Sequence, residues 1–146
     1  AFVGAMIFGF LADAFGNKRT VVVTLGIWSL IVLWAFQLGI VWDPKTEYWI
    51  LGVLVAIVLG GSQAASRSLQ GLFTPDANSA EFFGFFAVSG KFASIFGPLI
   101  YGILIAITGN VQSGVLSVLI FFVVGMIILW TVNEKKGMEE RQNPVL

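Results

Sequence analysis

Two residue types that dominate the chemistry of protein sites are absent from this sequence: its 146 residues include no histidine and no cysteine. Without cysteine there is neither a disulfide nor a thiolate site. Without histidine, the commonest metal ligand and the commonest general base near neutral pH are missing. Charged residues make up only 11% of the chain and sum to zero, with no basic run. We therefore expect no metal, no cofactor, no enzymatic activity and no nucleic-acid partner.

Apolar side chains are what the sequence has in excess. They make up 58% of the chain, and the mean hydropathy is +0.93, whereas a soluble domain has roughly 45–50% apolar and about 25% charged residues. This composition predicts an integral membrane protein whose first partner is the lipid bilayer. The chain begins inside an apolar run without the features of a signal peptide. We therefore expect an N-terminal half of the same chain to precede it.

Apolar segments separated by short polar stretches predict an all-α polytopic membrane protein. The expected spans are residues 1–12, 20–42, 48–72, 81–108 and 112–132. The first would reach only ~18 Å, short of the ~30 Å hydrocarbon core, so it is interpreted as the end of a longer helix. Residues 133–146 are expected to form a polar tail that is frayed or lies on the surface.

Basic residues gather on one side of the expected membrane. One side has only Lys45 in its loop, which covers residues 43–47 and contains the helix breaker Pro44. The loops and tail of the other side carry Lys18, Arg19, Lys135, Lys136 and Arg141. By the positive-inside rule, loops 13–19 and 73–79 and the C-terminus are expected to be cytoplasmic.

The spans differ in what their faces carry. Residues 20–42 and 112–132 hold no charge between their ends, so both are expected on the outside of a bundle. One face of span 48–72 is small in its first half, which allows close helix approach, and polar in its second half. This face consists of Gly52, Ala56, Gly60, Gln63, Arg67 and Gln70. Gln63 fits a substrate path or hydrogen-bonded packing, and Arg67 fits a gate or a snorkelling residue at the cytoplasmic rim.

Lys91 is the residue that is hardest to reconcile with lipid. It follows Glu81 by ten residues, or ~15 Å, and so lies near the membrane midplane, where a charge costs ~2.5–3.5 kcal/mol. We expect Lys91 to face a hydrated cavity or to pair with an acid. Its partner is then a substrate, an ion or a residue outside this sequence. Pro98 removes a backbone donor from the same helix and predicts a kink near Lys91.

A pattern G-x-x-x-D-x-x-G-x-K-R crosses the first cytoplasmic turn. Its members are Gly9, Asp13, Gly16, Lys18 and Arg19. The first glycine is expected to permit close packing, and the aspartate to cap or face a helix N-terminus. The second glycine supplies the turn, and the basic pair anchors at the anionic leaflet. This pattern resembles the loop signature of the major facilitator superfamily.

A longer stretch narrows the resemblance. The run G-G-S-Q-A-A-S-R-S-L at 60–69 is followed by A-E-F-F-G-F-F at 80–86, S-G-K at 89–91 and G-P-L at 97–99. With the loop motif, this resembles the vacuole-effluxer-like branch of that superfamily, typified by the autophagy-related vacuolar amino-acid effluxer. The resemblance implies the C-terminal part of a twelve-helix fold, comprising the end of helix eight and helices nine to twelve. In that fold the ninth and twelfth helices are peripheral, the tenth lines the cavity and the eleventh lies between the halves.

The resemblance also implies a function, namely secondary active transport of a small solute by alternating access in the export direction. The implied substrates are amino acids or related metabolites. Candidates are Lys91 and Gln63 for the substrate path, and Arg67 and Glu81 for a gate or ion pair. The family implies a bacterial plasma membrane, or a vacuolar membrane in a eukaryote. The alternative is a non-transporting protein of the same fold that packs helices or acts as a sensor.

Overall fold

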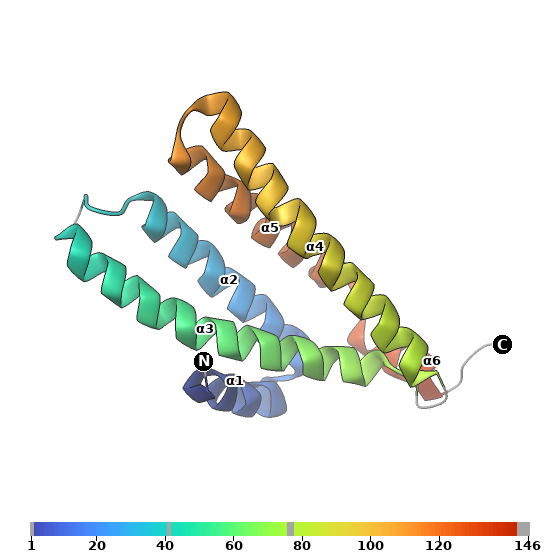
Figure 1. Cartoon of the computed structure of the whole chain (residues 1–146). Coiled ribbons are helices and arrows are strands. Elements are labelled where there is room, and N and C mark those ends of the chain that lie inside the picture. The colour runs from blue at the N-terminus through green and yellow to red at the C-terminus, as the bar shows by residue number, and fades with distance from the viewer. Residues whose placement is uncertain (1, 41, 76–77, 143–146) are drawn as a thin grey trace.

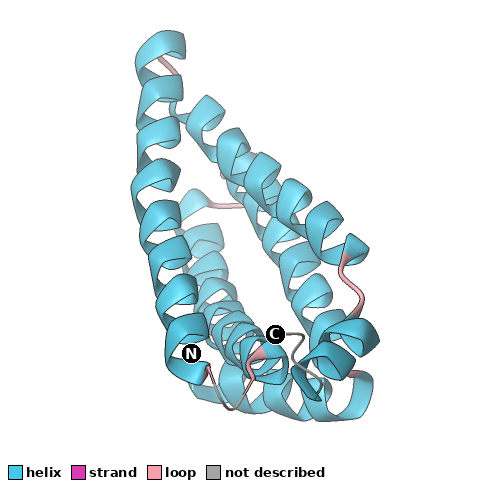
Figure 2. Ribbon diagram, turned by 90° about the vertical axis from the view of Figure 1, so that its right-hand side faces the viewer, coloured by secondary structure: helices cyan, strands magenta, loops and turns pink. Residues whose placement is uncertain are grey.

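The computed structural model describes residues 2–40, 42–75 and 78–142, and within these ranges every regular element is an α-helix. The helices, labelled in Figure 1 and joined by the short loops seen in Figure 2, are α1 (Phe2–Phe15), α2 (Asn17–Phe36), α3 (Pro44–Phe73), α4 (Ser79–Thr108), α5 (Val111–Thr131) and α6 (Glu134–Gln142). Some residues of the predicted segments lie outside the described ranges. They are residue 1 of the expected first span, residue 41 of the second, residues 76–77 of the expected loop 73–79 and residues 143–146 of the tail. The side chains of Lys135 and Arg141 are also outside the description. The predicted all-α class is confirmed.

The largest difference from the predicted helix ends lies between the second and third spans. The helix expected to run to Trp42 ends at Phe36, and the expected loop 43–47 contains the first turn of α3. Asp43 caps this turn by accepting a backbone N–H at 3.3 Å. Pro44 occupies the first helical position, where its missing N–H is not needed. The proline therefore starts a helix, and the prediction of a loop there was wrong.

The turn between α1 and α2 and the C-terminal tail are more helical than predicted. Helix α1 continues to Phe15 and α2 begins at Asn17, so the polar turn expected at 13–19 reduces to Gly16. That residue has φ of +93°, in the region that favours glycine. The tail, predicted to be frayed or to lie on the surface, forms α6 from Glu134 onward.

A buried carboxylate holds the connection between α2 and α3. Glu47, in the first turn of α3, is 0% exposed. It accepts the backbone N–H of Gly39 at 2.6 Å and of Trp42 at 3.0 Å. Gly39 has φ of +86°, which lets the chain reverse direction there. Charge-assisted hydrogen bonds are the strong ones, and a carboxylate near a helix N-terminus is favoured by the helix dipole. Where the sequence predicted a loop, the structure therefore has a helical turn whose buried carboxylate holds the preceding residues by two hydrogen bonds.

We expect Glu47→Ala to lower the free energy of unfolding by about 3 kcal/mol, because it leaves two backbone N–H groups without their acceptor. Asp43→Ala is the matched control, since it removes an exposed cap from the same helix and should cost about 1 kcal/mol. Thermal unfolding of the full-length protein in detergent measures both. Equal losses from the two variants would show that water replaces the buried carboxylate.

The core lies along α3, which contacts α1 and α2, and α2 in turn contacts α5. Two clusters of buried residues join α2 to α3: Val21 with Ala65 and Leu69, and Ile31 with Leu51 and Val58. Helix α5 also contacts α4, which completes the order of packing seen in Figure 1.

Helix α2 has neighbours on several sides. Its Trp28 donates from Nε1 to the hydroxyl of Ser62 in α3 at 3.4 Å. The same ring stacks on Phe122 of α5, with centroids 5.5 Å apart. The uncharged span was expected on the outside of a bundle, but within the described residues α2 contacts α1, α3 and α5. Apolar surface packs against lipid or another helix alike, so lack of charge does not distinguish the two.

Close approach of α1 to α3 depends on two glycines. A Cβ on Gly4 would lie 1.8 Å from a backbone carbonyl oxygen of α3, and one on Gly61 would lie 2.0 Å from the ring of Phe8. From the sequence, close approach between helices was expected at Gly9 and along the small half of the α3 face that begins at Gly52. Among the described residues, nothing lies within 4 Å of a Cβ built at either position. The close contacts therefore lie elsewhere than predicted, because the buried face of α3 is offset from the small-residue stripe.

Helix α4 is the least covered of the four long helices. None of its residues is buried, and it contacts α5 through its second half, where Tyr101 and Ile105 surround Gly114. Residues 79–96 are exposed apart from the half-buried Phe86. Helix α4 therefore consists of a packed half and a bare half.

Candidate functional site

The polar half of the α3 stripe lines two adjoining hollows on the exposed side of the helix. The first, of about 400 Å³, lies between α1 and α3 and has Gln63 and Arg67 in its wall. The second, of about 290 Å³, shares these two side chains and adds Ser62, Ser66 and Gln70. Both shared side chains are exposed. The structure therefore brings two of the predicted site residues together around one polar surface.

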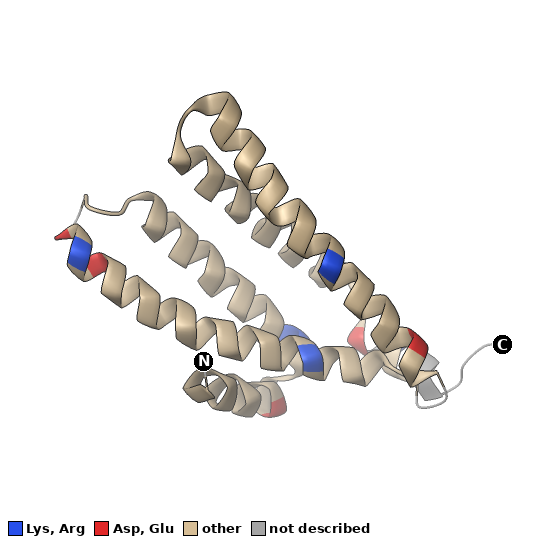
Figure 3. Cartoon of the chain, in the orientation of Figure 1, with Lys and Arg blue, Asp and Glu red and all other residues tan. Residues whose placement is uncertain are grey.

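Lys91 lies on the bare half of α4, where it forms the blue band on that helix in Figure 3. It is the thirteenth of the helix's 30 residues, about 18 Å from the Ser79 end. Its exposed ammonium has no hydrogen-bond or ion-pair partner among the described residues. Its backbone carbonyl accepts the Ser94 hydroxyl at 2.7 Å, which leaves the ammonium unaffected. A lone cation thus lies close to the middle of a long apolar helix.

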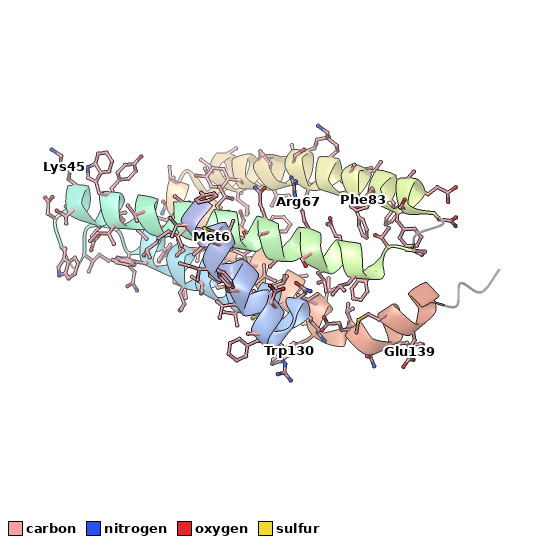
Figure 4. The ribbon with its side chains drawn as sticks, turned by 90° about the horizontal axis from the view of Figure 1, so that it is seen from below. Met6, Lys45, Arg67, Phe83, Trp130 and Glu139 are labelled. Atoms are coloured by element: carbon pink, nitrogen blue, oxygen red, sulfur yellow. The ribbon has the colours of Figure 1, made fainter. Side chains whose placement is uncertain are left out.

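Arg67 and Glu81 lie toward the same end of the bundle but do not pair. Arg67 precedes the end of α3 by six residues, or about 9 Å, and Glu81 is the third residue of α4. Both are exposed, and no ion pair joins them in the described part of the chain. In Figure 4 the Arg67 side chain extends from α3 toward the side on which α4 lies. An ion pair between the two stays a prediction.

Within the loop motif, Lys18 has the most defined surroundings. Its Nζ donates to the carbonyl of Trp130 at 3.0 Å and to that of Val132 at 2.5 Å. It therefore binds the C-terminal end of α5, and anchoring of the basic pair at the lipid leaflet stays a prediction. Asp13 is exposed and does not cap α2, whose N-cap is Gly16 without a side-chain hydrogen bond. Of the two roles expected for Asp13, capping was wrong, and facing a helix N-terminus stays a prediction.

Pro98 lies at the boundary between the two halves of α4. The helix continues through it without a break, so the size of the predicted kink stays a prediction.

No group of three or more metal-ligating side chains occurs in the described ranges.

The partners of Glu47 and Lys18 were not predicted from the sequence. Glu47 had a usable signal, since it lies in the first turn of a helix that Asp43 and Pro44 introduce. Lys18 had none, because its acceptors lie 112 and 114 residues away in the chain.

Four described helices are long and apolar enough to cross a membrane, and the chain is a polytopic α-helical membrane protein. The model of the family described as vacuole effluxer Atg22 like matches residues 1–142. The chain belongs to that family, which confirms the resemblance drawn from residues 60–99 and the loop motif.

Curated relatives place the family among transporters of the major facilitator type. The chain is 37% identical over 138 residues to the uncharacterized MFS-type transporter YxiO of Bacillus subtilis, covering 94% of this chain and 31% of that protein. It is 29% identical over 148 residues to autophagy-related protein 22-2 of Aspergillus niger, covering 94% and 25%. Autophagy-related protein 22 of Kluyveromyces lactis is 32% identical over 127 residues, covering 84% and 26%. The chain thus spans less than a third of each relative. No solved structure matches it significantly.

Proposed function

We propose that this chain forms part of a secondary active transporter that moves a small solute across a membrane by alternating access. Family membership and the transporter relatives support the class of function. The observation that carries the proposal for this chain is the uncovered polar surface on otherwise apolar helices. Gln63 and Arg67 line the hollows of α3, and Lys91, on the bare half of α4, has no partner within the described ranges.

The proposed substrates are amino acids or related metabolites, and the proposed direction is export. A substrate site near the membrane midplane is usual in transporters built from two halves. The position of Lys91 near the middle of α4 would place it at that depth, where its ammonium would bind the carboxylate of the solute through a charge-assisted hydrogen bond. Gln63 would contribute an amide that donates and accepts hydrogen bonds further along the path.

Arg67 and Glu81 are the proposed gate. They lie between the membrane middle and the end of the bundle that carries the α1–α2 turn and α6. Approach of the cytoplasmic ends of α3 and α4 would bring opposite charges together and close the path. Separation of these ends would open it. Pro98, between the packed and bare halves of α4, is where such movement would be accommodated.

The proposed orientation has the α1–α2 turn, the α3–α4 connection and α6 in the cytoplasm. Contacts within the chain bring these three segments to the same end. Lys18 binds the end of α5, and the last residue of α3, Phe73, touches Gly137 of α6. The proposed location is the plasma membrane of a bacterium, or the vacuolar membrane of a eukaryote.

Counterflow in proteoliposomes tests the proposal. The full-length protein is reconstituted with unlabelled neutral amino acid inside, and the uptake of the labelled amino acid is followed. We expect transient accumulation that protein-free liposomes do not show. If the protein gives no counterflow of amino acids, then organic anions or sugars are tested in the same way. Failure with every solute class would favour the non-transporting alternative.

A further inference from the structure

Lys18 of the loop motif caps the C-terminal end of α5, a helix that is distant from it in the sequence. The last four carbonyls of an α-helix lack intrahelical donors, and the C-terminus carries the negative end of the helix dipole. The two carbonyls that Lys18 binds belong to Trp130, in the last turn of α5, and to Val132, its C-cap. Lys18 therefore acts as a cationic cap supplied from outside the helix.

The capped end of α5 leads directly into α6. Only Val132 and Asn133 separate the two helices. Val132 has an extended backbone, with φ of −69° and ψ of 128°. Asn133 starts α6 by accepting the backbone N–H of Lys136 on its side-chain oxygen at 3.3 Å and that of Gly137 on its carbonyl at 3.1 Å. Because the Val132 carbonyl is bound to Lys18, the direction in which α6 leaves α5 depends on that lysine.

Helix α6 is docked rather than free. A Cβ on Gly137 would lie 2.7 Å from two ring carbons of Phe73, the last residue of α3. The carboxylate of Glu134 lies 3.9 Å from the position of a Cβ on Gly16, in the turn between α1 and α2. Helix α6 has nine residues, fewer than the ~12–15 that an isolated helix needs to be even marginally stable in water. Its helical form therefore depends on these contacts.

We propose that α6 is a latch, held shut by Lys18, that joins the cytoplasmic ends of α2, α3 and α5 into one unit. The latch does not include α4. Phe82 of α4 is separated from the Phe73–Gly137 contact by a hollow of about 490 Å³ that all three residues line. The bare half of α4 therefore has room to move while α2, α3 and α5 stay together. This device goes beyond the proposed transport and can be tested without it.

The absence of cysteine from this chain permits a direct test by cross-linking. Phe73→Cys and Gly137→Cys are introduced together into the full-length protein, with any other cysteines replaced, and a short bifunctional methanethiosulfonate is added. The new pair lies where ring and backbone now touch, so we expect rapid cross-linking. Adding Lys18→Met should slow it by roughly fivefold, the size of a favourable charge–dipole interaction. Lys18→Arg, which keeps a cationic donor, should restore most of the rate.

Lys45→Met is the matched control, because it removes an exposed lysine at the opposite end of α3 and should leave the rate unchanged. An equal rate in the Lys18→Met variant would overturn the role of Lys18. No cross-linking in any background would overturn the docking of α6 if trypsin also cleaves the tail of the double-cysteine variant no faster than that of the parent, because the loss of the Phe73 ring has then not undocked the helix.

A second variant keeps the test decisive if Lys18→Met does not fold. Gly137→Leu leaves Lys18 intact but has no room beside Phe73, so it should undock α6 and let its backbone fray. We expect trypsin to cleave the tail at Lys135 and Lys136 several-fold faster than in the parent. An unchanged cleavage rate would count against the latch.

Discussion

Lys91→Met is expected to lower counterflow by the full-length protein at least about tenfold, because a charged hydrogen bond to the solute contributes about 1.5–3 kcal/mol. The methionine side chain has a similar length and no charge, so it removes the ammonium without leaving a large cavity. In this structure the ammonium has no partner among the described residues, which leaves it available to a solute. Counterflow at several solute concentrations is the measurement. If a high solute concentration partly restores the counterflow of the Lys91→Met variant, the substitution has weakened the binding of the solute.

Two further variants separate substrate binding from a structural role of Lys91. Lys91→Arg keeps the charge and should retain part of the activity, whereas Lys45→Met, at the opposite end of α3, should retain all of it. If Lys91 only pairs with an acid elsewhere in the protein, Lys91→Met should reduce the yield of folded protein. Neutralising that acid as well should then restore the yield. Full counterflow by a well-folded Lys91→Met variant would exclude Lys91 from the substrate path.

Gly4→Ala is expected to destabilise the protein by about 3 kcal/mol, toward the upper end of what overpacking usually costs. The added methyl group would lie 1.8 Å from the carbonyl oxygen of Ile57. That neighbour is backbone and cannot rotate away, so α1 and α3 must move apart. Their separation would also disturb the contact of Phe8 with Gly61 and the hollow that contains Gln63 and Arg67. Thermal unfolding in detergent should show a midpoint several degrees lower.

Gly9→Ala is the control for this prediction, since it makes the same change in the same helix. Nothing among the described residues lies within 4 Å of a Cβ at Gly9, and alanine is the better helix former by about 1 kcal/mol. This variant should therefore be as stable as the parent or slightly more stable. If Gly4→Ala matches it, the α1–α3 interface can relax without cost.

Part of the candidate site could be predicted from the sequence because it depends on position along a helix. The 3.6-residue period places Gln63 and Arg67 on one face, and the structure confirms that they share one surface. The position of Lys91 near the middle of its helix follows from the length of the apolar span and the rise per residue. Whether Arg67 meets Glu81 does not follow from either, because it depends on how far α3 and α4 diverge.

What the sequence determined by itself is the class of protein, the number of long apolar helices and the family. Those features depend on composition, on local periodicity and on short motifs, all of which can be read one segment at a time. The tertiary structure alone decided which apolar faces pack and that α2 contacts α1, α3 and α5. It also decided that Gly4 and Gly61 rather than Gly9 and Gly52 allow close approach. Apolar faces are chemically alike, so which of them pack together is set by shape at the contact between helices. The partners of Lys18, 112 and 114 residues away, were decided in the same way.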